Sequence, residues 1–146
     1  MDPQSVTLDT QKQDKFFSDI IEYLENGNLP HDKQEARRTV IQSENYTIQN
    51  NLLFHLGVNR HKRFNHLEAI IYQLCIPPQC RLKLLTDFHE QTLHLGIEKT
   101  YLSLKLKYYW VDMYSDVRNF VDTCNVCHLI KTVPHQPKAL MKSWPM

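Results

Sequence analysis

The stretch that decides the fold of this chain runs over residues 89–127, opening with HEQTLHLGIEKT and closing with CNVC. It carries four ligand-type side chains in the spacing H-x4-H-x29-C-x2-C, namely His89, His94, Cys124 and Cys127. Two imidazoles and two thiolates suit tetrahedral Zn²⁺, a borderline-soft ion. We therefore predict one zinc ion, which is structural because protein ligands fill all four positions. The alternative is a small helical core with two buried histidines and two free thiols.

The residues around these ligands have the pattern of helices. Apolar positions three or four residues apart predict helices at 81–89, 98–108 and 112–124, the last with Asp112 as its N-cap. The middle helix carries a second apolar stripe, so we expect it to be mostly buried; this stripe is Leu102, Leu106 and Tyr109. Gly96 follows the second histidine, where a tight turn is expected.

The first half of the chain predicts a mixed structure. We expect a helix at 10–25, a short helix beginning at Asp32, a hairpin over 46–56 with an Asn50-Asn51 turn, and a third strand at 69–76. The predicted fold class is mainly α with a small β-hairpin or three-stranded sheet. The predicted domains are an α+β extension at 1–76, a three-helix zinc domain at 77–131 and an extended Pro-rich tail at 132–146.

Several motifs resemble the N-terminal HHCC (H2C2) zinc-binding domain of retroviral and gypsy-type retrotransposon integrases. They are the histidine and cysteine pairs, LGIEKT at 95–100, YYWVDM at 108–113 and DVRNFVDTCNVC at 116–127. Residues 9–76 resemble, more weakly, the segment that precedes integrase in such Pol polyproteins. Family members often have Gly before the second histidine, where this chain has Leu93. The resemblance implies a module that helps integrase to multimerise and contacts the DNA ends of the retroelement.

Charge is distributed unevenly along the chain. Residues 1–50 hold 9 acids and 5 bases, whereas residues 51–146 hold 7 acids and 12 bases. A basic surface favours binding to nucleic acid, although a solvated surface explains the same charges. If the chain binds DNA, the expected phosphate contacts are Arg81, Lys83, Lys99, Ser103 and Lys107. The basic loop at 59–66 could also grip a phosphate backbone, but a solvated loop tip is the simpler interpretation.

The resemblance also bears on catalysis. Integrases use a D,D,E set of carboxylates downstream of the zinc domain, and this chain has no Asp or Glu after Asp122. We therefore expect a module that is not an enzyme and has no small-molecule substrate, although its parent polyprotein would be an integrase. Two alternatives remain open. One is a protein–protein assembly module that uses the acidic helical hairpin and Tyr108-Tyr109-Trp110; the other is an inactive truncated polyprotein fragment.

Partners and location follow from composition. No apolar run approaches the ~18 residues needed to span a bilayer, so no membrane partner is expected. The N-terminus lacks the pattern of a signal peptide, and Cys-x2-Cys in a reducing compartment is more often a metal site than a disulfide. We expect weak DNA binding, possible self-association and an intracellular location, which is nuclear if the chain acts on DNA.

Overall fold

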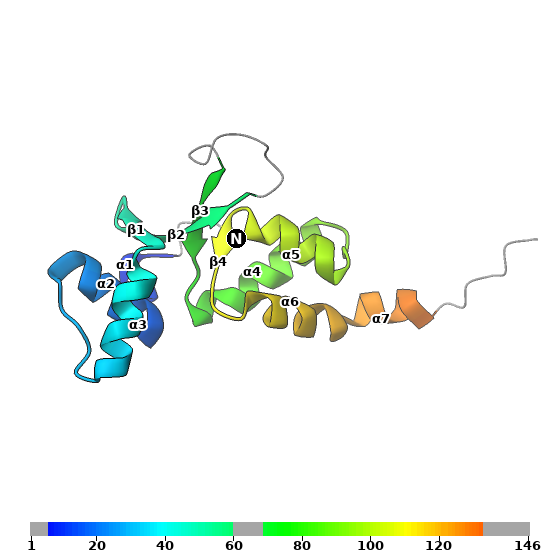
Figure 1. The fold of residues 1–146 in the computed structure, drawn as a ribbon. Helices are drawn as coiled ribbons and strands as arrows, with labels where there is room; N and C mark the ends of the chain where they lie inside the picture. The colour runs from blue at the N-terminus through cyan, green and yellow to red at the C-terminus, as the bar shows by residue number, and fades with distance from the viewer. Residues whose placement is uncertain (1–5, 60–68, 133–146) are drawn as a thin grey trace, which may run out of the picture.

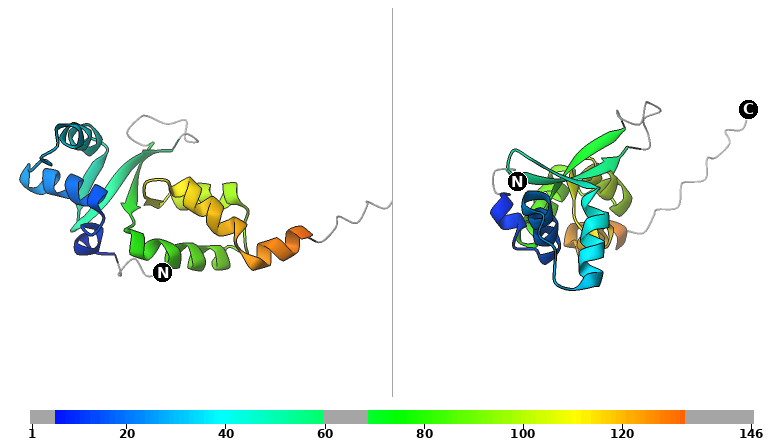
Figure 2. Two further views of the ribbon diagram at one scale, coloured as in Figure 1. Left: turned by 90° about the horizontal axis from the view of Figure 1, so that it is seen from below. Right: turned by 60° about the vertical axis from the view of Figure 1, so that its left-hand side comes forward.

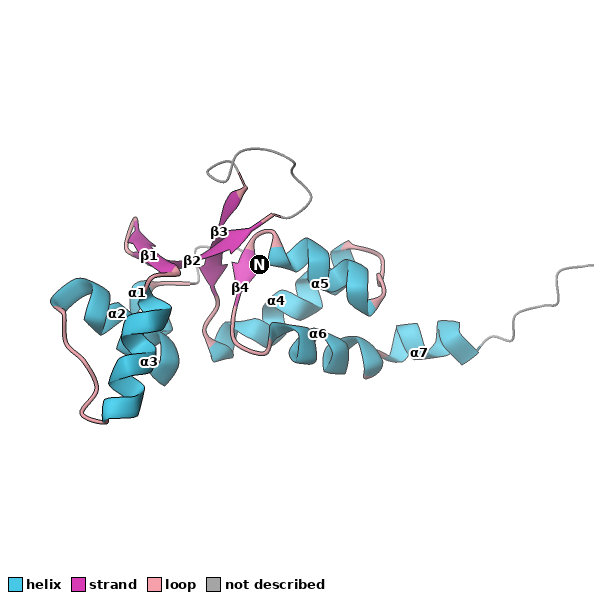
Figure 3. Ribbon diagram, viewed as in Figure 1, coloured by secondary structure: helices cyan, strands magenta, loops and turns pink. Residues whose placement is uncertain are grey.

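The computed structural model describes residues 6–59 and 69–132 (Figures 1 and 3). The first part holds three helices and two strands: α1 (Leu8–Gln11), α2 (Lys15–Asn26), α3 (Lys33–Ser43), β1 (Tyr46–Gln49) and β2 (Leu52–Val58). The second part holds β3 (Ile70–Cys75), α4 (Pro78–Gln91), α5 (Ile97–Lys105), β4 (Tyr108–Tyr109), α6 (Met113–Asp122) and α7 (Asn125–Thr132). The prediction of a mainly α fold with a small sheet is confirmed.

The sheet has four strands rather than three, in the order β1-β2-β3-β4. β1, β2 and β3 pair antiparallel, and β4 pairs parallel to β3. Helices α1–α3 lie on one side of the sheet in the views of Figures 1 and 2, and α4–α7 lie on the other. One apolar core cluster draws residues from both sides, including Phe17 and Ile21 of α2, Leu104 of α5 and Val117 of α6.

Local signals in the first part are mostly confirmed. The side chain of Asp32 accepts from the Glu35 N–H at 3.3 Å and caps α3. Asn50 and Asn51 have φ of 51° and 58°, which is the left-handed geometry that a two-residue hairpin needs. The predicted helix at 10–25 is instead two helices, α1 and α2, because the Asp14 side chain accepts from the Phe16 N–H at 3.0 Å and starts a new helix.

A buried amide joins the two parts of the sheet. β2 and β3 are paired as far as Phe54 and Leu74, after which β3 continues alongside β4. The side chain of Gln11, which has no exposed surface, connects β2 and β3 beyond the point where their pairing ends. Its Nε2 donates to the carbonyls of Leu53 (3.1 Å) and Cys75 (2.7 Å). Its Oε1 accepts from the Leu53 N–H at 2.9 Å, so one amide replaces the missing ladder bonds.

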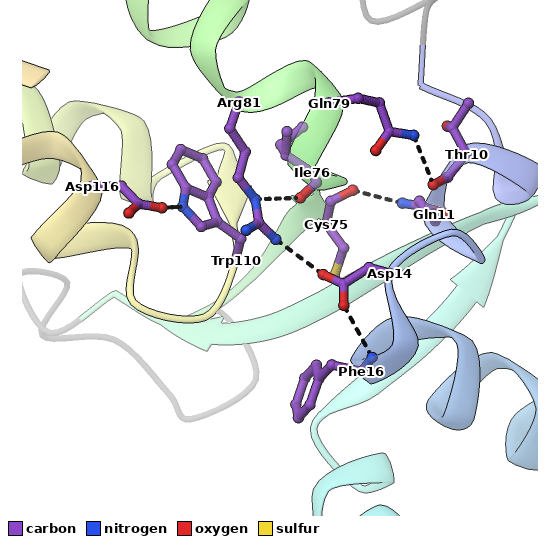
Figure 4. A network of polar contacts seen from close by, with 10 residues as sticks. All are labelled: Thr10, Gln11, Asp14, Phe16, Cys75, Ile76, Gln79, Arg81, Trp110 and Asp116. Carbon is purple, nitrogen blue, oxygen red and sulfur yellow. Dashed lines mark hydrogen bonds and ion pairs between the residues drawn. The ribbon is translucent and has the colours of Figure 1, made fainter.

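A second connection involves Arg81 in the first turn of α4 (Figure 4). Its Nη2 lies 3.1 Å from Asp14 Oδ2, and its Nε donates to the Ile76 carbonyl at 3.1 Å. The guanidinium also lies over the Trp110 ring, 5.7 Å from the centroid, and the Trp110 Nε1–H donates to Asp116 at 2.7 Å. The N-cap of α2, the start of α4 and the start of α6 are thereby tied together.

The helices near the predicted zinc ligands differ in detail from the prediction. The helix at 98–108 ends at Lys105 because Tyr108 and Tyr109 form β4 beside β3. Its second apolar stripe is not buried, since Leu102 and Leu106 are 49% and 52% exposed. Gly96 has φ −65°, which any residue adopts, and the tight turn expected beside it is formed by Leu93 and His94 instead.

Some predictions fall outside the described residues. The predicted loop at 59–66 lies outside them except for Asn59, and the predicted tail at 132–146 lies outside them except for Thr132. The domain boundary at residues 76 and 77 stays a prediction, and the sheet crosses it through the β3–β4 pairing. Within the described residues, no helix combines the length and apolar character needed to cross a membrane.

Candidate metal centre

The two histidines lie where α4 ends and the chain turns back. His89 sits in the last turn of α4 and is 1% exposed. The backbone N–H of His94 donates to the His89 carbonyl at 3.0 Å, so one hydrogen bond ties the two candidate ligands together. The two imidazole rings meet edge to face with centroids 4.6 Å apart. The H-x4-H spacing is therefore the spacing of a helix terminus and its closing turn.

This turn uses a conformation that is costly for side chains. Leu93 and His94 have φ of 56° and 58°, in the left-handed region that favours glycine. Leu93 occupies the position where family members often have Gly, and its side chain is 88% exposed. The turn is what directs the His94 ring back toward the end of α4.

The two cysteines lie at the start of α7. The Cys124 carbonyl accepts the first helical hydrogen bond, from the His128 N–H at 3.0 Å, so Cys124 is the N-cap residue. Backbone N–H groups at a helix start favour a thiolate. The pKa of Cys124 lies below its ordinary value, chiefly because the Cys127 N–H donates to the sulfur, with the Cys127 side chain and the Val126 N–H adding to the effect. Cys127 follows one turn later and is buried.

The four side chains converge on one point. His89 Nε2 lies 3.2 Å from Cys127 Sγ, and His94 Nδ1 lies 3.5 Å from Cys124 Sγ. One ligand atom from each of the four residues lies within 4.8 Å of all the others. Bonds of about 2.0 Å to nitrogen and 2.3 Å to sulfur put the corners of a tetrahedron roughly 3.3–3.8 Å apart. The donor set and spacing are consistent with one zinc ion.

The state of His89 fits the same interpretation. Burial lowers the pKa of His89, and the neighbouring His94 lowers it further, which favours the neutral imidazole that a metal requires. Its Nδ1 is buried and has no hydrogen-bond partner among the described residues. Among the described residues, the polar neighbour of its Nε2 is the sulfur of Cys127. Phe120 packs edge-on against the His89 ring, with centroids 5.6 Å apart.

The predicted phosphate contacts are divided between α4 and the region of α5. Lys99 and Ser103 lie on α5, and Lys107 follows that helix; the two lysines are exposed and Ser103 is half-buried. Lys83 is exposed on α4, whereas Arg81 on the same helix is half-buried and engaged by Asp14 and the Ile76 carbonyl. The role predicted for Arg81 at phosphate stays a prediction, and its contacts in the structure are internal.

Sequence reasoning missed two features that shape this centre. The left-handed pair at Leu93 and His94 has no glycine or asparagine to signal it. The role of Cys124 as the N-cap of α7 was also not expected, because the sequence predicted it as the last residue of the helix at 112–124. α7 begins at Asn125, directly after Cys124. The Cys-x2-Cys spacing was the only sequence signal for a break between two helices at this point.

Comparison with known proteins identifies the class of this segment. Residues 76–133, about two fifths of the chain, match the family model of the integrase zinc binding domain. These residues contain all four candidate ligands and helices α4–α7. This segment is therefore similar to the H2C2 zinc-binding domain of integrases.

The chain is also similar to curated proteins whose names refer to retroviruses and retrotransposons. It is 34% identical over 70 residues to the Pro-Pol polyprotein of Feline foamy virus, covering 45% of this chain and 6% of that polyprotein. It is 27% identical over 130 residues to the human Gypsy retrotransposon integrase-like protein 1, covering 87% of this chain and 23% of the relative. The Macaca fascicularis protein of the same name is 27% identical over 113 residues, covering 75% and 20%. The chain thus spans less than a quarter of these relatives.

Proposed function

We propose that this chain is a non-catalytic zinc-binding module of retroelement integrase type that binds nucleic acid. In this proposal His89, His94, Cys124 and Cys127 hold a single structural Zn²⁺. The observation that supports it best is the convergence of their four ligand atoms within 4.8 Å from two separate helix termini. When bound, the metal supplies a cross-link between the end of α4 and the start of α7.

Native mass spectrometry tests the metal assignment. The purified chain is expected to carry one zinc, which a chelator removes. Cys127→Ser should abolish stoichiometric zinc because it removes one of four ligands. Cys80→Ser is the matched control, since Cys80 is half-buried in α4 and lies outside the quartet. A zinc-free wild-type chain, or equal zinc content in the two variants, would refute the assignment.

The nucleic-acid part of the proposal is supported by exposed bases. Lys83, Lys99 and Lys107 are exposed and form no ion pair with another described residue, so their ammonium groups are available to phosphates. Each phosphate contact releases counterions, so binding should weaken as salt rises. We leave Arg81 out of this surface because its guanidinium is already bonded to Asp14.

Affinity for a blunt DNA duplex at two salt concentrations tests this surface. Combined Lys99→Glu and Lys107→Glu should weaken binding about tenfold or more and flatten the salt dependence. Lys33→Glu is the control, because Lys33 is exposed at the start of α3, a helix that lies on the other side of the sheet from α5 (Figure 1). Unchanged duplex affinity in the double variant would remove nucleic-acid binding through α5 from the proposal.

A second candidate function is protein assembly. It is favoured by the exposure of Leu102 in α5 and of Leu106, the residue that follows this helix. Exposed apolar side chains that lie next to one another and form a patch mark contact surfaces. Sedimentation of the zinc-loaded chain tests this: a dimer that Leu102→Ser together with Leu106→Ser converts to monomer would support assembly, and a monomer at all concentrations would exclude self-association through α5.

A further inference from the structure

A cleft lined by aromatic rings lies between β2, α5, β4 and the start of α6. Its volume is about 510 Å³, within the range of roughly 300–1,000 Å³ that is typical of small-ligand sites. Five of its lining residues carry aromatic rings with a polar group, namely His55, Tyr101, Tyr109, Trp110 and Tyr114. The centre proposed for zinc contributes none of the lining residues.

Its walls are fixed by ring contacts. His55 and Tyr109 are stacked, with centroids 3.7 Å apart and planes 8° from parallel. Tyr101 and Tyr114 meet edge to face at 5.1 Å and 86°. The Tyr114 hydroxyl donates to Glu98 at 2.5 Å, which holds the ring while it remains 40% exposed. Tyrosine rings held in place and partly exposed are surfaces on which a planar ligand can stack.

A buried amide determines which His55 nitrogen carries the proton. The Lys105 carbonyl can only accept, so the Gln73 Nε2 donates to it and the Gln73 Oε1 faces His55 Nδ1 at 2.7 Å. His55 Nδ1 must then be the N–H donor, which leaves Nε2 as an acceptor. Nε2 has no partner among the described residues and is not among their sealed polar atoms. Burial lowers the pKa of His55, with Gln73 opposing the shift, so the neutral form is favoured.

Gly57 makes this arrangement possible. A Cβ at Gly57 would lie 2.6 Å from Gln73 Oε1, so a larger residue there would displace the amide. Gln73 is itself 1% exposed. The backbone at Gly57 therefore approaches the buried Gln73 amide closely. Among the described residues, this amide contacts His55 Nδ1 and the Lys105 carbonyl, and these contacts orient the His55 ring.

The cleft also has charged groups at its edge. Lys105 lies over the Tyr101 ring, 5.8 Å from the centroid, and forms no ion pair among the described residues. Asp112 lines the cleft, is exposed, and does not use its side chain to cap α6. The site thus combines stacking surfaces, two acceptors (His55 Nε2 and Asp112) and one cation. A nucleobase matches this set, because it has two flat faces, N–H donors at its edge and a phosphate attached through the sugar.

We infer that this cleft binds one unstacked base of a single-stranded nucleic acid, with Tyr101 and Tyr114 as the stacking surface and Lys105 at the adjoining phosphate. The inference rests on the proposed nucleic-acid function and adds a site for a base to a surface proposed only for phosphates. An arginine side chain of a protein partner is the less suitable occupant, because Lys105 would repel a second cation at the same rings.

Binding of a short single-stranded DNA to the zinc-loaded chain tests the inference, with the same strand built of abasic sugars as the comparison. Both carry identical phosphates, so their difference reports the bases alone. Because stacking on an aromatic ring is sequence-tolerant and substantial, the strand with bases should bind about tenfold tighter. Tyr114→Leu should remove most of that preference. Tyr114→Phe should retain it, since the ring is kept.

Tyr72→Leu is the matched control, because Tyr72 is more exposed than Tyr114 and lies on β3 outside the cleft. Equal binding of the two strands, or equal losses in Tyr114→Leu and Tyr72→Leu, would overturn the inference. Complete competition by free nucleoside monophosphates at the strand's own concentration would also overturn it, in favour of a mononucleotide site. Thermal melting and zinc content establish that each variant is folded.

A blunt duplex in the same assay separates this inference from the proposed function. Loss of duplex binding in the Lys99→Glu and Lys107→Glu variant, with the base preference intact, would support both. Duplex binding through those lysines together with no preference for bases would overturn the cleft alone. A base preference with no duplex binding would contradict the phosphate surface while supporting the cleft.

Discussion

Helices α2 and α7 are held in the molecule by different means. α2 buries three large apolar side chains, Phe17, Ile20 and Ile21, each at most 1% exposed. α7 buries only Cys127 among its described side chains, at residues 125–129. Burying three large side chains contributes several kcal/mol by itself, at about 1.5–3 kcal/mol each. The position of α2 therefore follows from the apolar core, whereas that of α7 depends on whatever binds Cys127.

The largest expected effect separates these two cases. On chelation, α7 and the turn at 92–96 should lose protection from hydrogen exchange completely, and α4–α6 in part, while α2 keeps its protection. A structural zinc site contributes on the order of 10 kcal/mol to a small domain, and α7 has little apolar burial to replace it. Exchange measured by mass spectrometry checks this. Loss of protection in α2 equal to that in α7 would mean that the comparison is wrong.

A smaller effect is expected at the connection between the regions. Gln11→Ala leaves the Leu53 N–H and the carbonyls of Leu53 and Cys75 without their partner in a buried place. We expect a loss of about 3 kcal/mol in the free energy of unfolding, since each unsatisfied buried group costs about 1–3 kcal/mol. Urea denaturation of the zinc-loaded chain measures it. Gln34→Ala on the exposed side of α3 should change stability by less than about 0.5 kcal/mol.

The Asp14–Arg81 pair should contribute less. Asp14→Asn keeps an N-cap for α2, because Asn caps as well as Asp, and removes only the charge facing Arg81. The side chains of the pair are both 19% exposed, so we expect a loss of about 1 kcal/mol. A double-mutant cycle with Arg81→Met isolates the pairwise part. Additive losses in that cycle would show that the pair does not couple the two regions.

The smallest effect is expected at the turn before His94. Leu93→Gly removes a side chain that packs against little and relieves a left-handed backbone, at the expense of a more flexible unfolded chain. The net result should be a gain of about 0.5 kcal/mol, seen as a higher melting temperature. Gly96→Ala is the companion variant: Gly96 has an ordinary φ and open space around it. A destabilised Leu93→Gly chain would indicate that Leu93 makes a contact important for the turn.

The sequence predicted those features that depend on nearby residues. The Asp32 cap and the Asn50-Asn51 turn are local, and the structure has both. The convergence of the four candidate ligands was predictable because H-x4-H and C-x2-C each lie at one helix terminus. The two helix termini lie far apart in the sequence. Only the ligand types, two histidines and two cysteines, indicated that these termini meet.

Features decided by distant partners were not predictable in the same way. Tyr108 and Tyr109 continue a helical pattern, yet they form β4 because they pair with the edge of β3. In the sequence, Gln11 has no feature that distinguishes it from other polar helix residues. Its hydrogen bonds to the Leu53 and Cys75 carbonyls depend on the separation of β2 and β3 at that point. Leu102 and Leu106 match an apolar stripe, but no described element covers them enough to bury them.

The order of these pieces along the chain has a consequence for synthesis on the ribosome. Gln11 requires only β2 and β3 to complete its contacts, so the first three strands and α1–α3 can assemble as soon as Cys75 has emerged. β4, by contrast, joins β3 only after the two helices of the crossover, and Cys124 and Cys127 emerge later still. In a nascent chain His89 and His94 therefore emerge before Cys124 and Cys127, so the four candidate ligands can come together only late in folding.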